Sequence, residues 1–185
     1  RFGLFEKIQE GAQLDTSEME EFERVKKRLD KVCKAAHDKD VTLYVDAEES
    51  WIQQPLDEMV EAMMQLYNSK RCVVFNTFQI YRWDRLEYLR QQIEKAKSHN
   101  YLLGAKLVRG AYMEKERERA DAMGYKSPIH TNKKAVDKDF DDAVKLCLDD
   151  ISVVHICIAS QSEKSNLLAM QAMHKKGIPS NTPAI

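Results

Sequence analysis

Polar and charged side chains gather where three predicted strands end. In chain order these ends carry Asp46, Glu48 and Glu49, then Asn76, Thr77 and Gln79, then Lys106, Arg109 and Tyr112. Parallel α/β folds keep their active sites at such strand ends. Lys106 lies in a strand expected to be buried, and a buried cation is costly unless an anion pairs with it. Asp46, two strands earlier at a matching height, is the candidate anion.

Strand alternation places Lys106, Val108 and Gly110 on one face of the third strand and Leu107 and Arg109 on the other. The residue types alone leave structural roles open beside the chemical ones. These are a satisfied core pair for Asp46 and Lys106, a loop contact for Asn76, packing for Tyr112 and His155, and a solvated helix face for the EKERER run (114–119).

The elements that would position these residues alternate along the chain. Apolar residues at helical spacing predict helices over 17–37, 55–67, 83–97, 113–123, 137–149 and 163–176, the first opened by a capping box of Ser17 and Glu20. Apolar and β-branched runs predict strands over 41–46, 72–78, 104–112 and 151–160. Successive strands are spaced by roughly 30 residues, the length of a βαβ unit. The chain lacks a GxGxxG or Walker motif, which disfavours dinucleotide-binding and P-loop folds.

The sequence therefore predicts an α/β fold. A (βα)8 TIM-like barrel is the leading architecture, and since such barrels run to about 250 residues and eight strands, four βα units make roughly half of one. We expect residues 1–185 to form this partial barrel without a second domain. The chain begins with Arg and ends in IPSNTPAI, which suggests an excised piece of a longer protein.

Composition excludes several classes of function. The 185 residues carry a formal net charge of −1, so no basic excess indicates nucleic-acid binding. The 4 cysteines show no CxxC spacing, which argues against a zinc site and favours reduced, packed thiols in a compartment such as the cytoplasm. No metal site is expected, and no apolar run reaches the length of a membrane span.

Four segments resemble the proline dehydrogenase family. They are VDAEESW (45–51), FNTFQIYRWDRLEYL (75–89), GAKLVRGAYMEKERERA (104–120) and GYKSPI (124–129), and the similarity runs in order from about Ser17 to Pro179. The resemblance implies a distorted (βα)8 barrel that binds FAD at the carboxyl ends of its strands. L-Proline would lose a hydride to the flavin and become Δ1-pyrroline-5-carboxylate, and the electrons would pass to a membrane quinone.

The resemblance also implies roles for individual residues. Asp46 and Lys106 would be catalytic, with Lys106 against flavin N5. Cofactor contacts would come from Asn76 (an amide on the isoalloxazine), Lys106, Arg109, Gly110, Ala111, Ser160 and Gln161. The wall of the proline pocket would be formed by Leu107, Ala111 and Tyr112. Gly110, which lacks a Cβ, would let the backbone approach the cofactor closely.

The chain departs from the family pattern in two respects. Ala159-Ser160-Gln161-Ser162 stands where the family usually has Ala-Thr-His-Asn, which puts cofactor affinity in question. The paired arginines that clamp the proline carboxylate in the family would lie beyond residue 185, and a pocket lysine before residue 1. The 185-residue chain alone is therefore expected not to oxidise proline.

Two other functions remain alternatives. One is a barrel lyase or aldolase that uses Lys106 as a Schiff-base amine. The other is an inactive fragment whose exposed sheet edges make it an oligomerising module, and a homo-oligomer is expected of the fragment in any case. For the parent enzyme, the resemblance implies peripheral association with the inner membrane, on the matrix side of the mitochondrion in a eukaryote.

Overall fold

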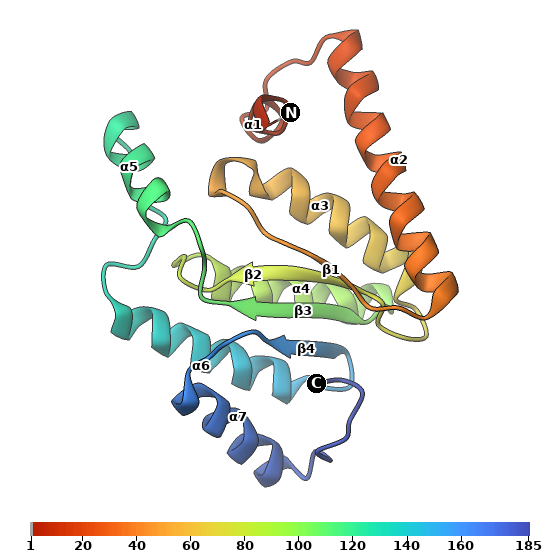
Figure 1. The fold of residues 1–185 in the computed structure, drawn as a ribbon, viewed down its shortest axis with the longest axis vertical. Coiled ribbons are helices and arrows are strands. Elements are labelled where there is room, and N and C mark those ends of the chain that lie inside the picture. Colours follow the sequence, from red (N-terminus) through yellow and green to blue (C-terminus); the bar gives the residue numbers. More distant parts are fainter. Residues whose placement is uncertain (1) are drawn as a thin grey trace.

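The structure is a computed structural model, and it describes residues 2–185. Helices and strands alternate along most of the chain (Figure 1). The elements are α1 (Phe2–Gln9), α2 (Thr16–Lys39), β1 (Leu43–Val45), α3 (Ser50–Tyr67), β2 (Val74–Gln79), α4 (Arg85–His99), β3 (Leu103–Val108), α5 (Met113–Met123), α6 (Lys133–Asp149), β4 (Val154–Ile158) and α7 (Glu163–Lys176).

The four strands form one parallel sheet in the order β1-β2-β3-β4. Each strand is thus paired with its successor in the chain, which is the connectivity of a barrel wall. The prediction of four βα units in a parallel α/β fold is confirmed. Within the described residues, no helix has both the length and the apolar character needed to cross a membrane.

The main core lies between the sheet and helices α3, α4 and α6, which cover one of its faces (Figure 1). Leu103, Ala105 and Leu107 of β3 point into this core and are fully buried. On the opposite face Thr77, Lys106 and Cys157 lie side by side across three strands. Alternation along each strand therefore separates an apolar face under the helices from a face that carries polar groups.

The N-terminal region differs from the prediction. Helix α1 was not expected, and it packs on α3, where Phe5 joins Ile52 and Met59 in a small apolar cluster. The capping box of α2 is formed by Asp15 and Glu18 rather than by Ser17 and Glu20. Asp15 accepts a hydrogen bond from the Glu18 backbone N–H at 2.8 Å, and the Glu18 carboxylate accepts from that of Asp15 at 3.1 Å.

Helix α3 begins at Ser50, five residues before the proline that was expected to open it. Other parts of the chain satisfy the backbone groups of this early turn. Gln9 accepts from the Gln54 N–H at 3.0 Å, and its amide donates to the Ser50 carbonyl at 2.8 Å. Pro55 lacks an N–H and normally marks the start of a helix. These tertiary contacts extend α3 on the N-terminal side of Pro55, back to Ser50.

The strand β3 is shorter than predicted and stops at Val108, leaving 109–112 as a connection to α5. Likewise β4 covers Val154–Ile158 rather than 151–160, and α6 starts four residues early because Asn132 caps it and accepts from the Ala135 N–H. The shortened strands leave the loops after β3 and β4 free to line a common cavity at the carboxyl edge of the sheet.

Candidate active site

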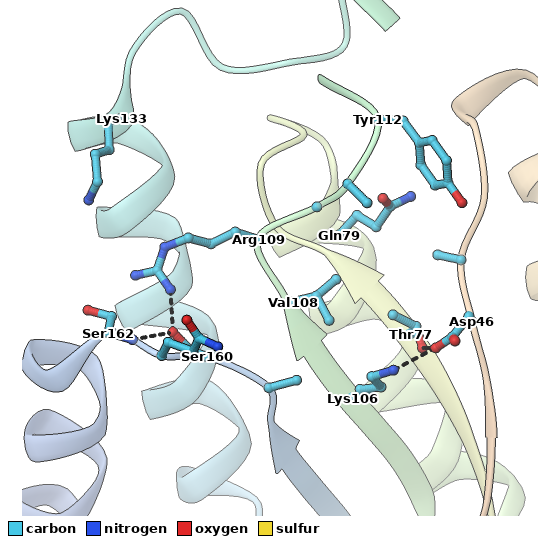
Figure 2. Close-up of a pocket in the computed structure, with 15 residues that line it drawn as sticks. Asp46, Thr77, Gln79, Lys106, Val108, Arg109, Tyr112, Lys133, Ser160 and Ser162 are labelled. Carbon is cyan, nitrogen blue, oxygen red and sulfur yellow. Dashed lines mark hydrogen bonds and ion pairs between the residues drawn. The ribbon is translucent and has the colours of Figure 1, made fainter. Parts of the chain in front are cut away.

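A cavity of about 740 Å³ lies at the carboxyl ends of the strands. Most residues singled out from the sequence line it (Figure 2), namely Asp46, Lys106, Arg109, Gly110, Ala111, Tyr112, Ser160 and Gln161. The cavity walls also include Thr77, Gln79, Lys133 and Ser162. Its volume falls within the range of small-molecule and cofactor sites.

The expected ion pair between Lys106 and Asp46 is present. Lys106 Nζ lies 2.6 Å from Asp46 Oδ1 (Figure 2), and the two side chains are 23% and 70% exposed. Thr77 Oγ1 supports the pair, since it donates to the Val45 carbonyl at 2.8 Å and lies 3.4 Å from Asp46 Oδ1. Lys106 is thus held at the cavity surface as a fixed positive charge whose partner still faces solvent.

Arg109 connects two loops of the site. Its guanidinium donates to Ser160 Oγ at 2.6 Å (Figure 2), to Asp137 Oδ1 at 3.0 Å and to Ser165 Oγ at 3.1 Å. The guanidinium carbon also lies 4.3 Å from the centre of the Phe140 ring. The side chain therefore ties the β4–α7 loop to α6 and fixes Ser160 at the cavity wall. Asp137 faces both Arg109 and Lys133, and their hydrogen bonds hold the pKa of its carboxyl below the ordinary value, that from Lys133 having the larger effect.

Gly110 has a backbone φ of +143°, a conformation that favours glycine. A Cβ at this position would lie 2.5 Å from the ring of Tyr81. The missing side chain thus makes room for Tyr81, whose hydroxyl accepts from the Tyr112 N–H at 3.3 Å. The structure gives Gly110 a packing reason in addition to the cofactor approach expected from the sequence.

Tyr112 closes one side of the cavity from the N-terminal end of α5 (Figure 2). Its hydroxyl donates to Glu48 Oε2 at 2.8 Å. This hydrogen bond, with a smaller contribution from burial, raises the pKa of Tyr112 to about 12. The phenol is therefore protonated at neutral pH and anchors the loop that follows β1.

Two of the expected site residues lie elsewhere. Asn76 is 3% exposed and donates to Asp57 Oδ1 at 2.9 Å, and it pairs in register with Ala105 on the helix-covered face. Leu107 is fully buried in the main core. Asn76 therefore does not face the cavity with Asp46, Lys106 and Tyr112, because it is one residue out of phase with Lys106.

Gln79 is the amide that reaches the cavity from β2. The sequence places it among the polar strand-end residues, but the family resemblance assigns the cofactor contact to Asn76. It lies two residues after Thr77, which pairs with Lys106 in register. Gln79 Nε2 donates to the Glu48 carbonyl at 2.7 Å. Matching the alternation of β2 to that of β3 was the signal that could have identified it.

Glu116 is a second residue whose place was not predicted. The EKERER run was interpreted as a solvated helix face, but Glu116 is completely buried. Its carboxylate accepts from the Ser50 backbone N–H at 2.5 Å and from Ser50 Oγ at 2.6 Å. Glu116 thus caps α3 from a different helix and fixes α5 against it, next to Tyr112.

Comparisons with known proteins identify a family and a fold that this chain shares. A sequence model of the proline dehydrogenase family matches residues 4–184. Proline dehydrogenase 1, mitochondrial, of Drosophila melanogaster is 35% identical over 177 residues, and the match covers 90% of this chain and 26% of the relative. The Homo sapiens protein of the same name is 30% identical over 158 residues, and the match covers 84% of this chain and 26% of the relative.

Solved structures share the fold. The crystal structure of proline utilization A (PutA) from Bdellovibrio bacteriovorus, inactivated by N-propargylglycine, aligns with a TM-score of 0.80 at 23% identity and covers 85% of this chain and 16% of that one. The chain spans about a quarter of the length of the Drosophila and human relatives. With the family match over nearly all of its residues, the chain belongs to the proline dehydrogenase family.

Proposed function

We propose that this chain supplies one wall of the site at which a proline dehydrogenase oxidises L-proline. The Asp46–Lys106 pair at the carboxyl edge of the sheet carries the proposal, because it places a fixed cation at the surface of a 740 Å³ cavity in a chain of this family. A positioned charge of this kind stabilises negative charge that develops during reaction.

The residues around the cavity fit a flavin. Lys106 and the Gln79 amide offer polar contacts for an isoalloxazine ring, and the small side chains of Ala47 and Ala111 leave room beside them. Arg109 and Ser160, joined by a hydrogen bond at the cavity wall, would offer further polar contacts to FAD. FAD, when bound, accepts the hydride that proline loses.

The chain's own groups then have separate tasks. Lys106 would hold a positive charge beside a bound flavin, and Asp46 keeps the ammonium in place and balances its charge. Tyr112 contributes to the substrate wall, with its phenol fixed by Glu48. Arg109 positions Ser160 for the cofactor.

The names of the relatives support a proposal for where in the cell the protein acts. Several are named mitochondrial. We therefore place the protein in proline catabolism at the matrix side of the mitochondrial inner membrane, with a quinone as the electron acceptor. Residues 1–185 would form part of a single barrel domain, and self-association through the edges of the partial sheet is the expected behaviour of this segment alone.

The test is anaerobic reduction of flavin by proline in the full-length gene product. Purification is expected to give a yellow protein whose flavin absorbance falls on addition of L-proline and returns with a quinone analogue. A protein that binds no flavin, or whose flavin is not reduced by proline, would refute the proposal. Borohydride in the presence of a carbonyl substrate should not trap Lys106, because the ammonium is already paired with Asp46; trapping would favour the lyase alternative instead.

A further inference from the structure

A buried ionic cluster lies on the helix side of the sheet, behind the cavity. Its centre is Asp57 of α3, which is 3% exposed. Asp57 Oδ1 accepts from Gln53 Nε2 and from Asn76 Nδ2, both at 2.9 Å, and Oδ2 accepts from Arg85 Nη1 at 2.7 Å. Burying a carboxylate is costly, and the three donors to Asp57 offset that cost.

Asp57 fixes the orientation of the Gln53 side chain. A carboxylate accepts hydrogen bonds and does not donate them, so the amino end of the Gln53 amide must face Asp57. The carbonyl end then points the other way, and Gln53 Oε1 accepts from the Glu48 backbone N–H at 2.9 Å. Gln53 is itself 3% exposed, which leaves its amide little freedom to rotate.

Glu48 is the point at which this cluster meets the cavity. Its N–H is held by Gln53, its carbonyl accepts from Gln79 Nε2 at 2.7 Å, and its carboxylate accepts from the Tyr112 hydroxyl at 2.8 Å. Asp46, the partner of Lys106, is two residues upstream in the same loop. The loop after β1 is thus held by hydrogen bonds from both sides. Gln53 binds it from the buried side, and Gln79 and Tyr112 bind it from the cavity side.

We propose that Asp57 is a positioning residue of the proline dehydrogenase site, which acts through Gln53 to hold the loop that carries Asp46 and Glu48. Neither Asp57 nor Gln53 lines the cavity, and the hydrogen bond from the Glu48 N–H to Gln53 links them to the loop that carries Asp46. This inference rests on the proposed function, and it assigns a role in the reaction to a carboxylate on the opposite side of the sheet.

The first test is Asp57→Asn in the full-length gene product, with Glu61→Gln as the matched control. Glu61 is one turn further along α3, is 8% exposed and pairs with Lys95 at 2.7 Å, so its substitution also removes a buried charge. Hydrogen exchange of peptides covering 43–49 should accelerate in the Asp57 variant and stay unchanged in the control. Flavin reduction by saturating proline should slow by about tenfold or more in the Asp57 variant alone, since a misplacement of about 1 Å can cost about 100-fold in rate.

Two further variants separate positioning from a general loss of folding. Gln53→Met keeps the Asp57–Arg85 pair and removes the hydrogen bonds that join Gln53 to Asp57 and to Glu48. It should reproduce the faster exchange and the slower reduction. Adding Gln53→Glu to Asp57→Asn moves the carboxylate one turn along α3, where it can accept from both Glu48 and the new amide. This double variant should regain most of the exchange protection and of the rate.

Unchanged exchange over 43–49 in the Asp57 variant would overturn the proposal, as would equal effects in the Glu61 control or a double variant no better than Asp57→Asn. If the unsubstituted protein shows no proline-dependent reduction, the proposed function fails, and with it the catalytic part of this inference. The comparison of hydrogen exchange over 43–49 between the Asp57 and Glu61 variants would still establish or exclude that Asp57 stabilises the loop.

Discussion

Replacing Lys106 with methionine should separate the contribution of this charge to the rate of the reaction from its contribution to the stability of the fold. The partner carboxylate of Asp46 is 70% exposed, so the pair is largely solvated on one side. Exposed ion pairs contribute about 0–1 kcal/mol to folding. For a chain of this size that corresponds to a shift in melting temperature of at most about 4 °C. The methionine variant should therefore fold and melt almost normally.

The effect on the reaction should be much larger. Removing one group that stabilises developing charge typically costs about 100- to 1000-fold in rate, equivalent to about 2.7–4 kcal/mol. We expect flavin reduction by saturating proline in the full-length gene product to slow by this order in Lys106→Met. The FAD dissociation constant should change less, because the charge on Lys106 matters most as hydride arrives.

Anaerobic stopped-flow absorbance at the flavin band measures the rate, with fluorescence titration for FAD and calorimetry for the melting temperature. Lys106→Arg retains the charge and should be mild. Lys97→Met removes a lysine that is 36% exposed, pairs with Asp150 at 2.8 Å and does not line the cavity, and should leave the rate unchanged. An unaltered reduction rate in Lys106→Met, or a loss matched by an equal loss of FAD affinity, would refute the role.

Three other substitutions test separate parts of the structure. Gly110→Ala should destabilise the chain by roughly 2–5 kcal/mol, because it combines a strained φ with a Cβ 2.5 Å from an aromatic ring; a melting temperature equal to that of the parent would contradict this. The hydrogen bond to Asp30 raises the pKa of Tyr67 to about 12. Its contribution to stability is complete below the unfolded-state pKa of about 10 and is lost as the pH rises through the folded value. Denaturant titrations at several pH values between about 10 and 12 give the free energy of unfolding as a function of pH. This free energy should fall less steeply with rising pH in Tyr67→Phe than in the parent, and equal pH dependence would exclude the effect. Gln161→His with Ser162→Asn should tighten FAD binding in the full-length gene product by restoring the usual family residues, whereas equal dissociation constants would show that the present pair already suffices.

The sequence was sufficient to predict the sheet and the central pair of the site. Parallel strands bring their carboxyl ends to one edge, so Asp46 and Lys106 could be placed together from strand spacing and the cost of an unpaired buried cation. Both inferences depend on local pattern and simple geometry. The structure has the two residues in contact at 2.6 Å.

The error at Asn76 has a specific cause. Alternation along one strand defines two faces but does not say which face points to the helices, and β2 is buried along its whole length. Only the register with β3, in which Thr77 is opposite Lys106, decides that Gln79 faces the cavity. Register between strands is a tertiary property, and the apolar pattern of a fully covered strand does not fix its phase.

The start of α3 and the burial of Glu116 were missed for a related reason. Ser50 receives its cap from Glu116, which is 66 residues away in the sequence, and Gln54 donates to Gln9, 45 residues away. Helix-start rules consider a few neighbouring positions and cannot detect a cap supplied by another element. A charged run such as 114–119 likewise gives no indication that one of its glutamates faces inward.

The register of the sheet limits how this protein can change in length. Along β2 and β3 every second residue belongs to the cavity side and the others to the core, and Lys106 is directly followed by the buried Leu107. A deletion of one codon within β3 ahead of Lys106 would turn a cation into the core and a leucine towards the cavity. Lineages descended from this gene can therefore exchange residues one by one in these strands, whereas gains and losses of residues must fall outside them.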